Sequence, residues 1–166
     1  MLKPRKIRPC LWFDTNAEEA VAFYLSVFPA SAITRMTRYG EAGREVHHME
    51  PGTVMTIEFE LEGESFIALN GGPAFQFTEA VSFEIDCDTQ AEVDFYWERL
   101  TVGSDPASQR CGWLRDQFGV SWQVVPVGLM DLLTDPDLKK AQVAMTAMLE
   151  MQKIDIVAIR QLVAQA

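Results

Sequence analysis

Alternating apolar and polar residues mark two short stretches of the chain, and a helical pattern follows each of them. In PCLWFD the apolar residues Leu11 and Phe13 flank Trp12, and VSFEID has the same alternation. A period of two is typical of a strand with one apolar face and one mixed face. The residues that follow each stretch carry apolar side chains at the three- and four-residue spacing of an amphipathic helix. We therefore expect a strand and then a helix at both places.

These two stretches belong to an internal repeat. FDTNAEEAVAFYLSVF (13–28) is similar to IDCDTQAEVDFYWERL (85–100) at a shift of 72 residues, and GESFIALNGG (63–72) is similar to GVSWQVVPVG (119–128) at a shift of 56. The second copy is therefore shorter by 16 residues, 72 minus 56, between its helix and its last strand. Such self-similarity predicts two copies of one structural unit.

Further strands complete the two copies. The first copy has strand patterns at about 32–39, 53–61 and 65–70, while the second keeps CGWLRD and VSWQVVP and has a strand that is short or lost within TVGSDPASQ. The sequence predicts an α+β fold of paired βαβββ modules, whose mixed sheets form a cup with the helices outside, followed by C-terminal helices. We expect a single domain, 1–166, with a first module at 6–72, a shortened second module at 80–127 and a helical tail at 128–166.

Short polar side chains precede the predicted helices and can cap their first turns. The expected caps are Asn16 with Glu19, Thr89 with Glu92, Asp135 before Pro136, and Asp155. The tail is rich in apolar residues, which predicts either packing on its own domain or a dimer contact.

The composition narrows the class of protein. Apolar residues make up 48% of the 166 residues, enough for a compact domain, and the formal charge of −10 argues against a nucleic-acid partner. No run of about 18 apolar residues predicts a membrane span, and the basic N-terminus has too short an apolar run for a signal peptide. The three cysteines form no Cys-x-x-Cys pair, so we expect neither a disulfide framework nor a zinc knuckle, and a cytoplasmic location.

Four stretches carry a resemblance to a known family: PCLWFDTNAEEAVAFYLSVFP, FIALNGGPAFQFTEAVSFEIDCDTQAEVDFYW, CGWLRDQFGVSWQVVP and MLEMQKIDI. Together they resemble the vicinal oxygen chelate superfamily, which includes glyoxalase I, extradiol dioxygenases and bleomycin-resistance proteins. Within it they are most similar to the PhnB-like branch, also labelled 3-demethylubiquinone-9 3-methyltransferase-like. The resemblance implies the cup of paired βαβββ modules and a homodimer, and it implies no settled activity.

The methyltransferase label predicts a particular arrangement of glycines in the sequence. A typical enzyme that uses S-adenosylmethionine has a Gly-rich turn between a strand and a helix of a parallel sheet. The notable glycine pair here, Gly71 and Gly72, is followed by Pro73 in a loop. The sequence therefore argues against methyl transfer.

The resemblance also allows a prediction about metal binding. Metal-dependent members use His or Glu from the first and last strands of each module. The corresponding positions here are Pro9 or Arg8, Val81 or Ala80, Ile67, and Gln123. Among these side chains Gln123 alone offers a ligand atom, and a neutral amide oxygen is a weak one. We therefore expect no metal at these positions and no other cofactor.

Two glutamates are candidates for chemistry. Phe83 and Ile85 should face the helices, which directs Glu84 to the mixed face of its strand. A carboxylate there can act as a general base or bind a cationic group, and the alternative is a solvated or partnered side chain at the rim. Glu58 has the same parity within VMTIEFE.

Aromatic and amide side chains complete the expected ligand-binding set. Trp12 and Trp113 can stack on a planar ligand or a cation, with core or interface packing as the alternative. Asn70, Ser82 and Gln123 can fix a ligand by hydrogen bonds, although Asn70 has the alternative role of ending its strand.

These residues favour a protein that binds a small organic molecule, cationic or aromatic, in the cup and without a metal. The alternative is a metal-independent enzyme of isomerase, lyase or hydrolase type that uses Glu84 or Glu58 as its base. A metal-dependent lyase or dioxygenase and a dimeric scaffold are the remaining hypotheses.

Overall fold

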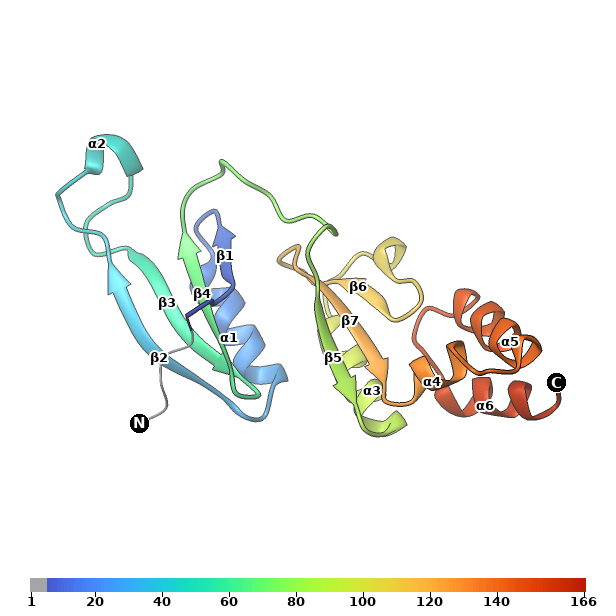
Figure 1. The fold of residues 1–166 in the computed structure, drawn as a ribbon. Coiled ribbons are helices and arrows are strands. Elements are labelled where there is room, and N and C mark those ends of the chain that lie inside the picture. The colour runs from blue at the N-terminus through green and yellow to red at the C-terminus, as the bar shows by residue number, and fades with distance from the viewer. Residues whose placement is uncertain (1–5) are drawn as a thin grey trace. The chain divides into compact units, whose positions relative to one another are not determined.

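The computed structural model describes residues 6–166, which form two compact units. The first unit ends at Gln76, and the second comprises Phe77–Ala166. Figure 1 shows the elements of both units.

The first unit contains β1 (Cys10–Phe13), α1 (Ala17–Val27), β2 (Ser31–Arg38), α2 (Arg44–His47), β3 (Val54–Leu61) and β4 (Glu64–Asn70). The second contains β5 (Phe83–Cys87), α3 (Gln90–Leu100), the short 3-10 helix η1 (Pro106–Ser108), β6 (Trp113–Arg115), β7 (Ser121–Pro126), α4 (Leu129–Leu133), α5 (Leu138–Leu149) and α6 (Ile156–Ala164). Strand boundaries in the first unit agree with the sequence-based prediction to within one residue. The stretch TVGSDPASQ holds η1 and no strand, as the shortened repeat suggested.

The first unit is a four-stranded mixed sheet with one covered face. Its strand order is β1-β4-β3-β2, with β1 and β4 parallel and the other pairs antiparallel. One face carries the buried row Leu11, Ala68 and Ile57, and α1 covers it with its own buried residues, among them Val21 and Tyr24 (Figure 1). The opposite face is mixed in character, as the alternation predicted.

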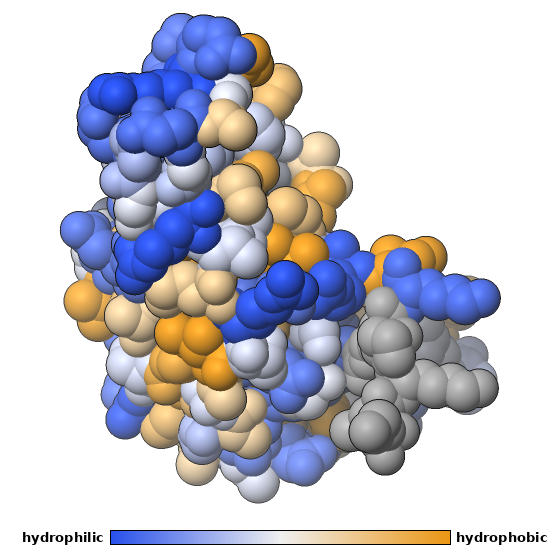
Figure 2. Space-filling model, turned by 90° about the vertical axis from the view of Figure 1, so that its left-hand side faces the viewer, coloured by the Kyte–Doolittle hydropathy of each residue, from blue (hydrophilic) through white to orange (hydrophobic). Residues whose placement is uncertain are grey.

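The edge of this sheet is exposed. The last strand of the order, β2, has no buried residue and leaves Ile33 and Met36 exposed. Figure 2 views the molecule from the side of β2 and shows apolar residues in orange between hydrophilic residues in blue.

The second unit repeats this plan with three strands. Its order is β5-β7-β6, with β5 and β7 parallel and β6 and β7 antiparallel. Phe83, Trp122 and Leu114 form an apolar row across the three strands, and α3 packs on this side through Val93 and Trp97. The other face carries polar and apolar residues side by side. With this second sheet, the expected α+β class with two mixed sheets is confirmed.

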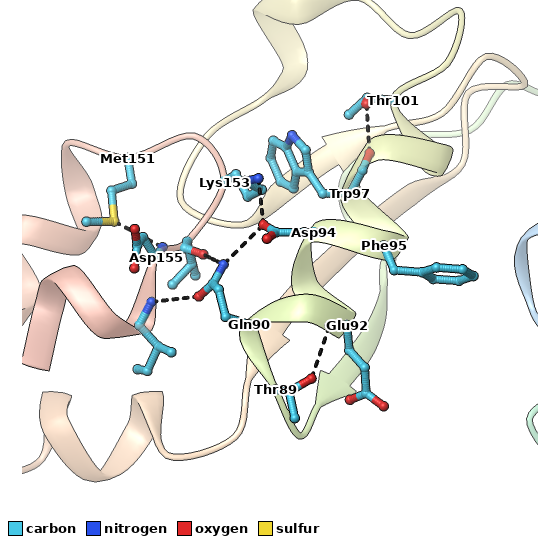
Figure 3. A network of polar contacts seen from close by, with 12 residues as sticks. Thr89, Gln90, Glu92, Asp94, Phe95, Trp97, Thr101, Met151, Lys153 and Asp155 are labelled. Carbon is cyan, nitrogen blue, oxygen red and sulfur yellow. Dashed lines mark hydrogen bonds and ion pairs between the residues drawn. The ribbon is translucent and has the colours of Figure 1, made fainter.

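A helical tail follows β7 and has a core of its own. Its buried residues are Leu129, Ala144, Ala147, Ile154, Ile156, Ile159 and Val163. The amide of Gln90, at the start of α3, donates from Nε2 to the Ile154 carbonyl and accepts from the Ile156 N–H at Oε1, both at 3.0 Å. Lys153 Nζ lies 2.6 Å from Asp94 Oδ1 on the same helix (Figure 3). These contacts tie the tail to α3, which agrees with the prediction that it packs on its own domain. No helix among residues 6–166 is long and apolar enough to span a membrane.

Two of the four predicted helix caps are confirmed, and the other two are wrong. The Thr89 hydroxyl accepts from the Glu92 N–H, and Asp155 accepts from the Ala158 N–H, as expected. Asn16 makes no side-chain cap bond, and Asn70 accepts from the first N–H of α1.

The second correction concerns the start of α5. Asp137 caps this helix by accepting from the Lys139 N–H, two residues later than predicted. Asp135 accepts from the Asp137 N–H at 2.8 Å, so its side chain stabilises the turn before the helix and is not the cap.

Candidate functional site

Three of the predicted site residues meet in one row on the open face of the second sheet. Glu84 is paired with Gln123 in the β5–β7 register, and Gln123 is paired with Trp113 in the β6–β7 register. Paired residues lie on the same side of a sheet, so the three side chains lie on the face opposite α3. Glu84 is exposed, while Gln123 and Trp113 are half-buried.

The polar groups of this row differ in the hydrogen bonds and ion pairs that they already make. Gln123 Nε2 donates to the Ser82 hydroxyl at 2.9 Å, which orients the amide and leaves Oε1 as an acceptor. Among residues 6–166, no hydrogen bond or ion pair engages the carboxylate of Glu84. The row therefore combines an open carboxylate, an oriented amide and an indole ring, the groups that recognise an organic cation.

The neighbouring row is formed by Ser121 on β7 and Arg115 on β6, which are paired in the register. Arg115 Nη1 lies 3.4 Å from Glu79 Oε1, and Ser121 is buried. Sequence reasoning did not select either residue, although the parity of Gln123 places Ser121 on the same face.

Asp116 holds the β6–β7 hairpin, which carries Trp113 and Gln123 of the first row and both residues of the second. It is 4% exposed, and its Oδ1 accepts from the N–H groups of Phe118 (2.8 Å) and Val120 (3.0 Å). Its Oδ2 accepts from Trp122 Nε1 at 2.8 Å. Sequence reasoning also missed this residue, and the signal that could have found it is the turn pattern Asp-x-x-Gly in RDQFGV.

In the first unit, Glu58 lies on the open face of the sheet but is already paired. Its Oε2 lies 2.7 Å from Arg8 Nη1, and its Oε1 lies 3.9 Å from Arg35 Nη1. Arg35 is also its register partner on β2. Glu58 therefore shares its carboxylate with two guanidinium groups, whereas Glu84 does not.

Cys10 ends the Glu58 row, since it is paired with Ile67, the register partner of Glu58. Partial burial of its thiol raises the pKa of Cys10, and the nearby Arg8 guanidinium opposes this shift only in part. A raised pKa is the opposite of what an activated nucleophile needs.

Trp12 lies on the open face of the first sheet and packs against the chain that follows β4. Its Nε1 donates to the Gly72 carbonyl at 2.8 Å, and its ring meets Phe75 edge-on with centroids 4.9 Å apart. A Cβ at Gly71 would lie 2.3 Å from the Trp12 ring, so glycine is required for this close approach. The indole therefore has a packing partner and a hydrogen-bond acceptor within its own unit.

Asn70 is fully buried and its amide is fully used. Oδ1 accepts from the Ala17 N–H at 2.9 Å, and Nδ2 donates to the Val54 carbonyl and to Glu18 Oε2, each at 3.0 Å. These bonds join the start of α1 to β3 and β4. They give Asn70 a structural role.

A separate cavity of about 490 Å³ lies in the first unit where β1 and β4 end. Its lining includes Asp14, Thr15, His47, His48 and Met49. The imidazole of His47 is held in place, because Nδ1 accepts from the Met49 N–H at 3.0 Å and the ring packs on Tyr39.

The positions that carry metal ligands in the superfamily do not fit a metal here. Ile67 has no donor atom, and Gln123 offers only a neutral amide oxygen, which is a weak ligand for a divalent ion. Arg8, one of the first-strand positions, presents a cation that pairs with Glu58. Among residues 6–166, no three His, Cys, Asp or Glu side chains come together as a metal site would require.

Within residues 6–166, the turn from a strand into a helix that S-adenosylmethionine ordinarily needs is not glycine-rich. The turn from β1 into α1 contains Asp14, Thr15 and Asn16 and no glycine. Gly71 and Gly72 follow β4 and lead into a loop, and Gly72 donates its N–H to the Asp14 carbonyl.

Comparison with known proteins identifies the family. Residues 5–125 match the family model described as 3-demethylubiquinone-9 3-methyltransferase. A PhnB protein from Bacillus cereus, which carries the same methyltransferase name, is 34% identical with a TM-score of 0.62, and the match covers 74% of this chain and 100% of that chain. A search of curated proteins finds no match.

More distant structures share the fold alone. Protein PA1353 from Pseudomonas aeruginosa is 20% identical with a TM-score of 0.55, over 74% of this chain and 97% of its own. A variant of the fosfomycin resistance protein FosX from Listeria monocytogenes, complexed with Mn(II) and 1S,2S-dihydroxypropylphosphonic acid, is 15% identical with a TM-score of 0.52, over 74% of this chain and 92% of its own. The chain belongs to the 3-demethylubiquinone-9 3-methyltransferase family, the PhnB-like group of the vicinal oxygen chelate fold.

Proposed function

We propose that the protein binds a small organic molecule with a cationic or aromatic group on the open face of its second sheet, without a metal. The observation that carries the proposal is the row of Glu84, Gln123 and Trp113 across β5, β7 and β6. The carboxylate of Glu84 in this row has no counterion among residues 6–166.

The chemistry of the row sets the expected affinity. An indole ring attracts a cation by about 0.5–2 kcal/mol, and an exposed carboxylate adds up to about 1 kcal/mol. Hydrogen bonds to Gln123 Oε1 and burial of methylene groups contribute further. A bare organic cation is therefore expected to bind with a Kd in the millimolar range, near about 4 kcal/mol of binding free energy.

The test uses benzyltrimethylammonium, which combines a cation with an aromatic ring. We expect saturable binding in the presence of EDTA, measured by chemical-shift changes in the NMR spectrum of the protein. Glu84→Gln and Trp113→Leu should each weaken binding several-fold.

Glu98→Gln is the matched control, because it makes the same charge change at an exposed position of α3. Equal binding by Glu84→Gln and Glu98→Gln would contradict the proposal. Binding that requires an added divalent ion would contradict its metal-independent part.

The second candidate is a metal-independent isomerase, lyase or hydrolase with Glu84 as general base. The pairing of Glu58 with Arg8 and Arg35 favours Glu84 over Glu58 for this role. A base must come within hydrogen-bond distance of a proton of the bound substrate, and the exposed carboxylate of Glu84 leaves room for that approach. Loss of turnover with retained binding in Glu84→Gln would support the enzyme over the simple binder.

The cup formed by the two sheets, the homodimer, the absence of a nucleic-acid partner and the cytoplasmic location remain predictions. Light scattering on the purified chain tests the homodimer, and a mass near twice 18.7 kDa is expected.

A further inference from the structure

The helices α5 and α6 of the tail pack side by side, and a groove of about 310 Å³ runs along α5 (Figure 1). The α5 residues that line it are Lys139, Gln142, Val143, Thr146, Ala147 and Glu150. Their spacing of three and four residues places them on one face of the helix. Leu162 of α6 borders the same groove and is 47% exposed, so the groove combines an apolar wall with polar ends.

The two charged residues of the groove stand at the ends of α5 that its dipole disfavours. Lys139 lies in the first turn and Glu150 is the C-cap, whereas a helix favours an anion at its start and a cation at its end. Lys139 Nζ donates to the Ala166 carbonyl at 2.6 Å and keeps two further N–H donors. Among residues 6–166, no hydrogen bond or ion pair engages the carboxylate of Glu150. The stability of α5 itself therefore does not account for this arrangement of charge.

The groove also lies outside the part of the chain that the family fold explains. The family model matches residues 5–125, and α5 begins at Leu138. The family resemblance therefore assigns this face no role.

The lining residues of α5 form a self-complementary set. When two copies of α5 lie antiparallel, each lining position faces another lining position. The facing pairs are then Lys139 with Glu150, Gln142 with Ala147, and Val143 with Thr146. A two-fold interface requires such a surface, on which the same residues occur on both sides. Opposite charges meet at both ends of the pair, and the short side chains of Thr146 and Ala147 allow the two helices to approach closely.

We propose that a second copy of this chain docks in the groove, with the two α5 helices antiparallel and Leu162 of each copy against α5 of the other. The 12 residues of α5 extend over about 18 Å, so the contact is smaller than the about 800 Å² per partner of a standard stable interface. A dissociation constant of about 0.1 mM is expected. The contact is independent of the ligand row on the second sheet and of the function proposed for it.

The test is sedimentation equilibrium at protein concentrations from about 10 µM to about 1 mM and at about 0.15 M salt. We expect the average mass of the wild type to rise across this range. Lys139→Glu and Glu150→Lys should each weaken the association about tenfold or more, because two attractive pairs become two repulsive pairs.

Mutual rescue tests the antiparallel geometry. An equimolar mixture of the two single variants should associate again, because the two carboxylates of one chain then face the two ammonium groups of the other. The double variant Lys139→Glu/Glu150→Lys should associate like the wild type. Loss of association in each single variant without rescue in the mixture would overturn the proposal.

Lys140→Glu is the matched control, because it makes the same charge change at a neighbouring residue that does not line the groove. It should associate like the wild type. Glu150→Lys separates association from folding, since a cation at the end of a helix is favourable and the free energy of unfolding should stay equal or rise. A wild-type mass that does not change with concentration would overturn the proposal and leave the groove to a partner of another kind. Association that the charge reversals leave unchanged, or that Lys140→Glu weakens equally, would also overturn it.

Discussion

Removal of the Asp116 carboxylate should destabilise the second unit more than any single change on the open face itself. In Asp116→Ala the N–H of Val120 and the indole N–H of Trp122 lose their buried acceptor, while the half-buried N–H of Phe118 can turn to water. A buried donor that loses its partner costs about 1–3 kcal/mol, so two such donors cost about 2–6 kcal/mol. Relief from burying a charge offsets part of this cost, and we expect a net loss of about 3 kcal/mol.

The assay is urea unfolding followed by tryptophan fluorescence and by far-UV circular dichroism. The matched control is Asp105→Ala, because Asp105 caps η1 by accepting from the Ala107 N–H at 2.9 Å in an exposed position. The control should lose about 1 kcal/mol or less. Asp116→Asn should fall between the two, since its Oδ1 can still accept from the backbone while its amide N–H₂ opposes Trp122 Nε1.

The reasoning is refuted if Asp116→Ala and Asp105→Ala lose similar free energy of unfolding. It is also refuted if Asp116→Ala keeps its stability while the fluorescence of the native state is unchanged, because the Trp122 indole would then have no need of this acceptor.

Three further predictions concern other parts of the chain. Gly71→Ala should displace the Trp12 ring and cost about 1–3 kcal/mol by overpacking, measured by urea unfolding, and an unchanged stability would contradict the close approach. The Lys153 hydrogen bond holds the pKa of the Asp94 carboxyl below its usual value, so the contribution of this pair is present above about pH 4 and is lost as the pH falls through the lowered pKa. Asp94→Asn should accordingly lower stability by less than about 1 kcal/mol at neutral pH, and its difference from the wild type should shrink as the pH falls below about 4. Burial, reinforced by neighbouring acidic groups, raises the pKa of the Cys87 thiol to about 12, so iodoacetamide at mildly alkaline pH should modify the other two cysteines of the native protein and spare Cys87, as read by mass spectrometry.

Periodicity predicted the elements well because each sheet has one face covered by a helix. A strand that is buried on one side must alternate, and the rule holds through Leu11 and Phe13 on β1 and through Trp122 and Val124 on β7. The internal repeat then located the same plan twice. It even indicated the missing strand, where the second unit has η1 in its place.

Helix starts were less predictable than strands, because a polar residue before a helix can leave its cap bond unmade. Asn16 has the residue type of an N-cap and makes no such bond, while the Ala17 N–H donates to Asn70, which lies 53 residues further along the chain. The same bond explains why Asn70, a reasonable ligand-binding candidate by its position at a strand end, is an internal link. Sequence alternation assigns a side chain to a face and says nothing of how many of its hydrogen bonds are already made.

The choice of candidate site depends on this difference between the face on which a side chain lies and the hydrogen bonds that it already makes. Alternation assigned both Glu58 and Glu84 to mixed faces, and both lie there. Arg8, 50 residues away in the sequence, pairs with Glu58 and satisfies it, whereas the described residues supply no such cation to Glu84. A carboxylate left without a partner beside an oriented amide and an indole has no evident stabilising role in the sheet. We therefore expect substitutions in the row of Glu84, Gln123 and Trp113 to change binding without changing stability.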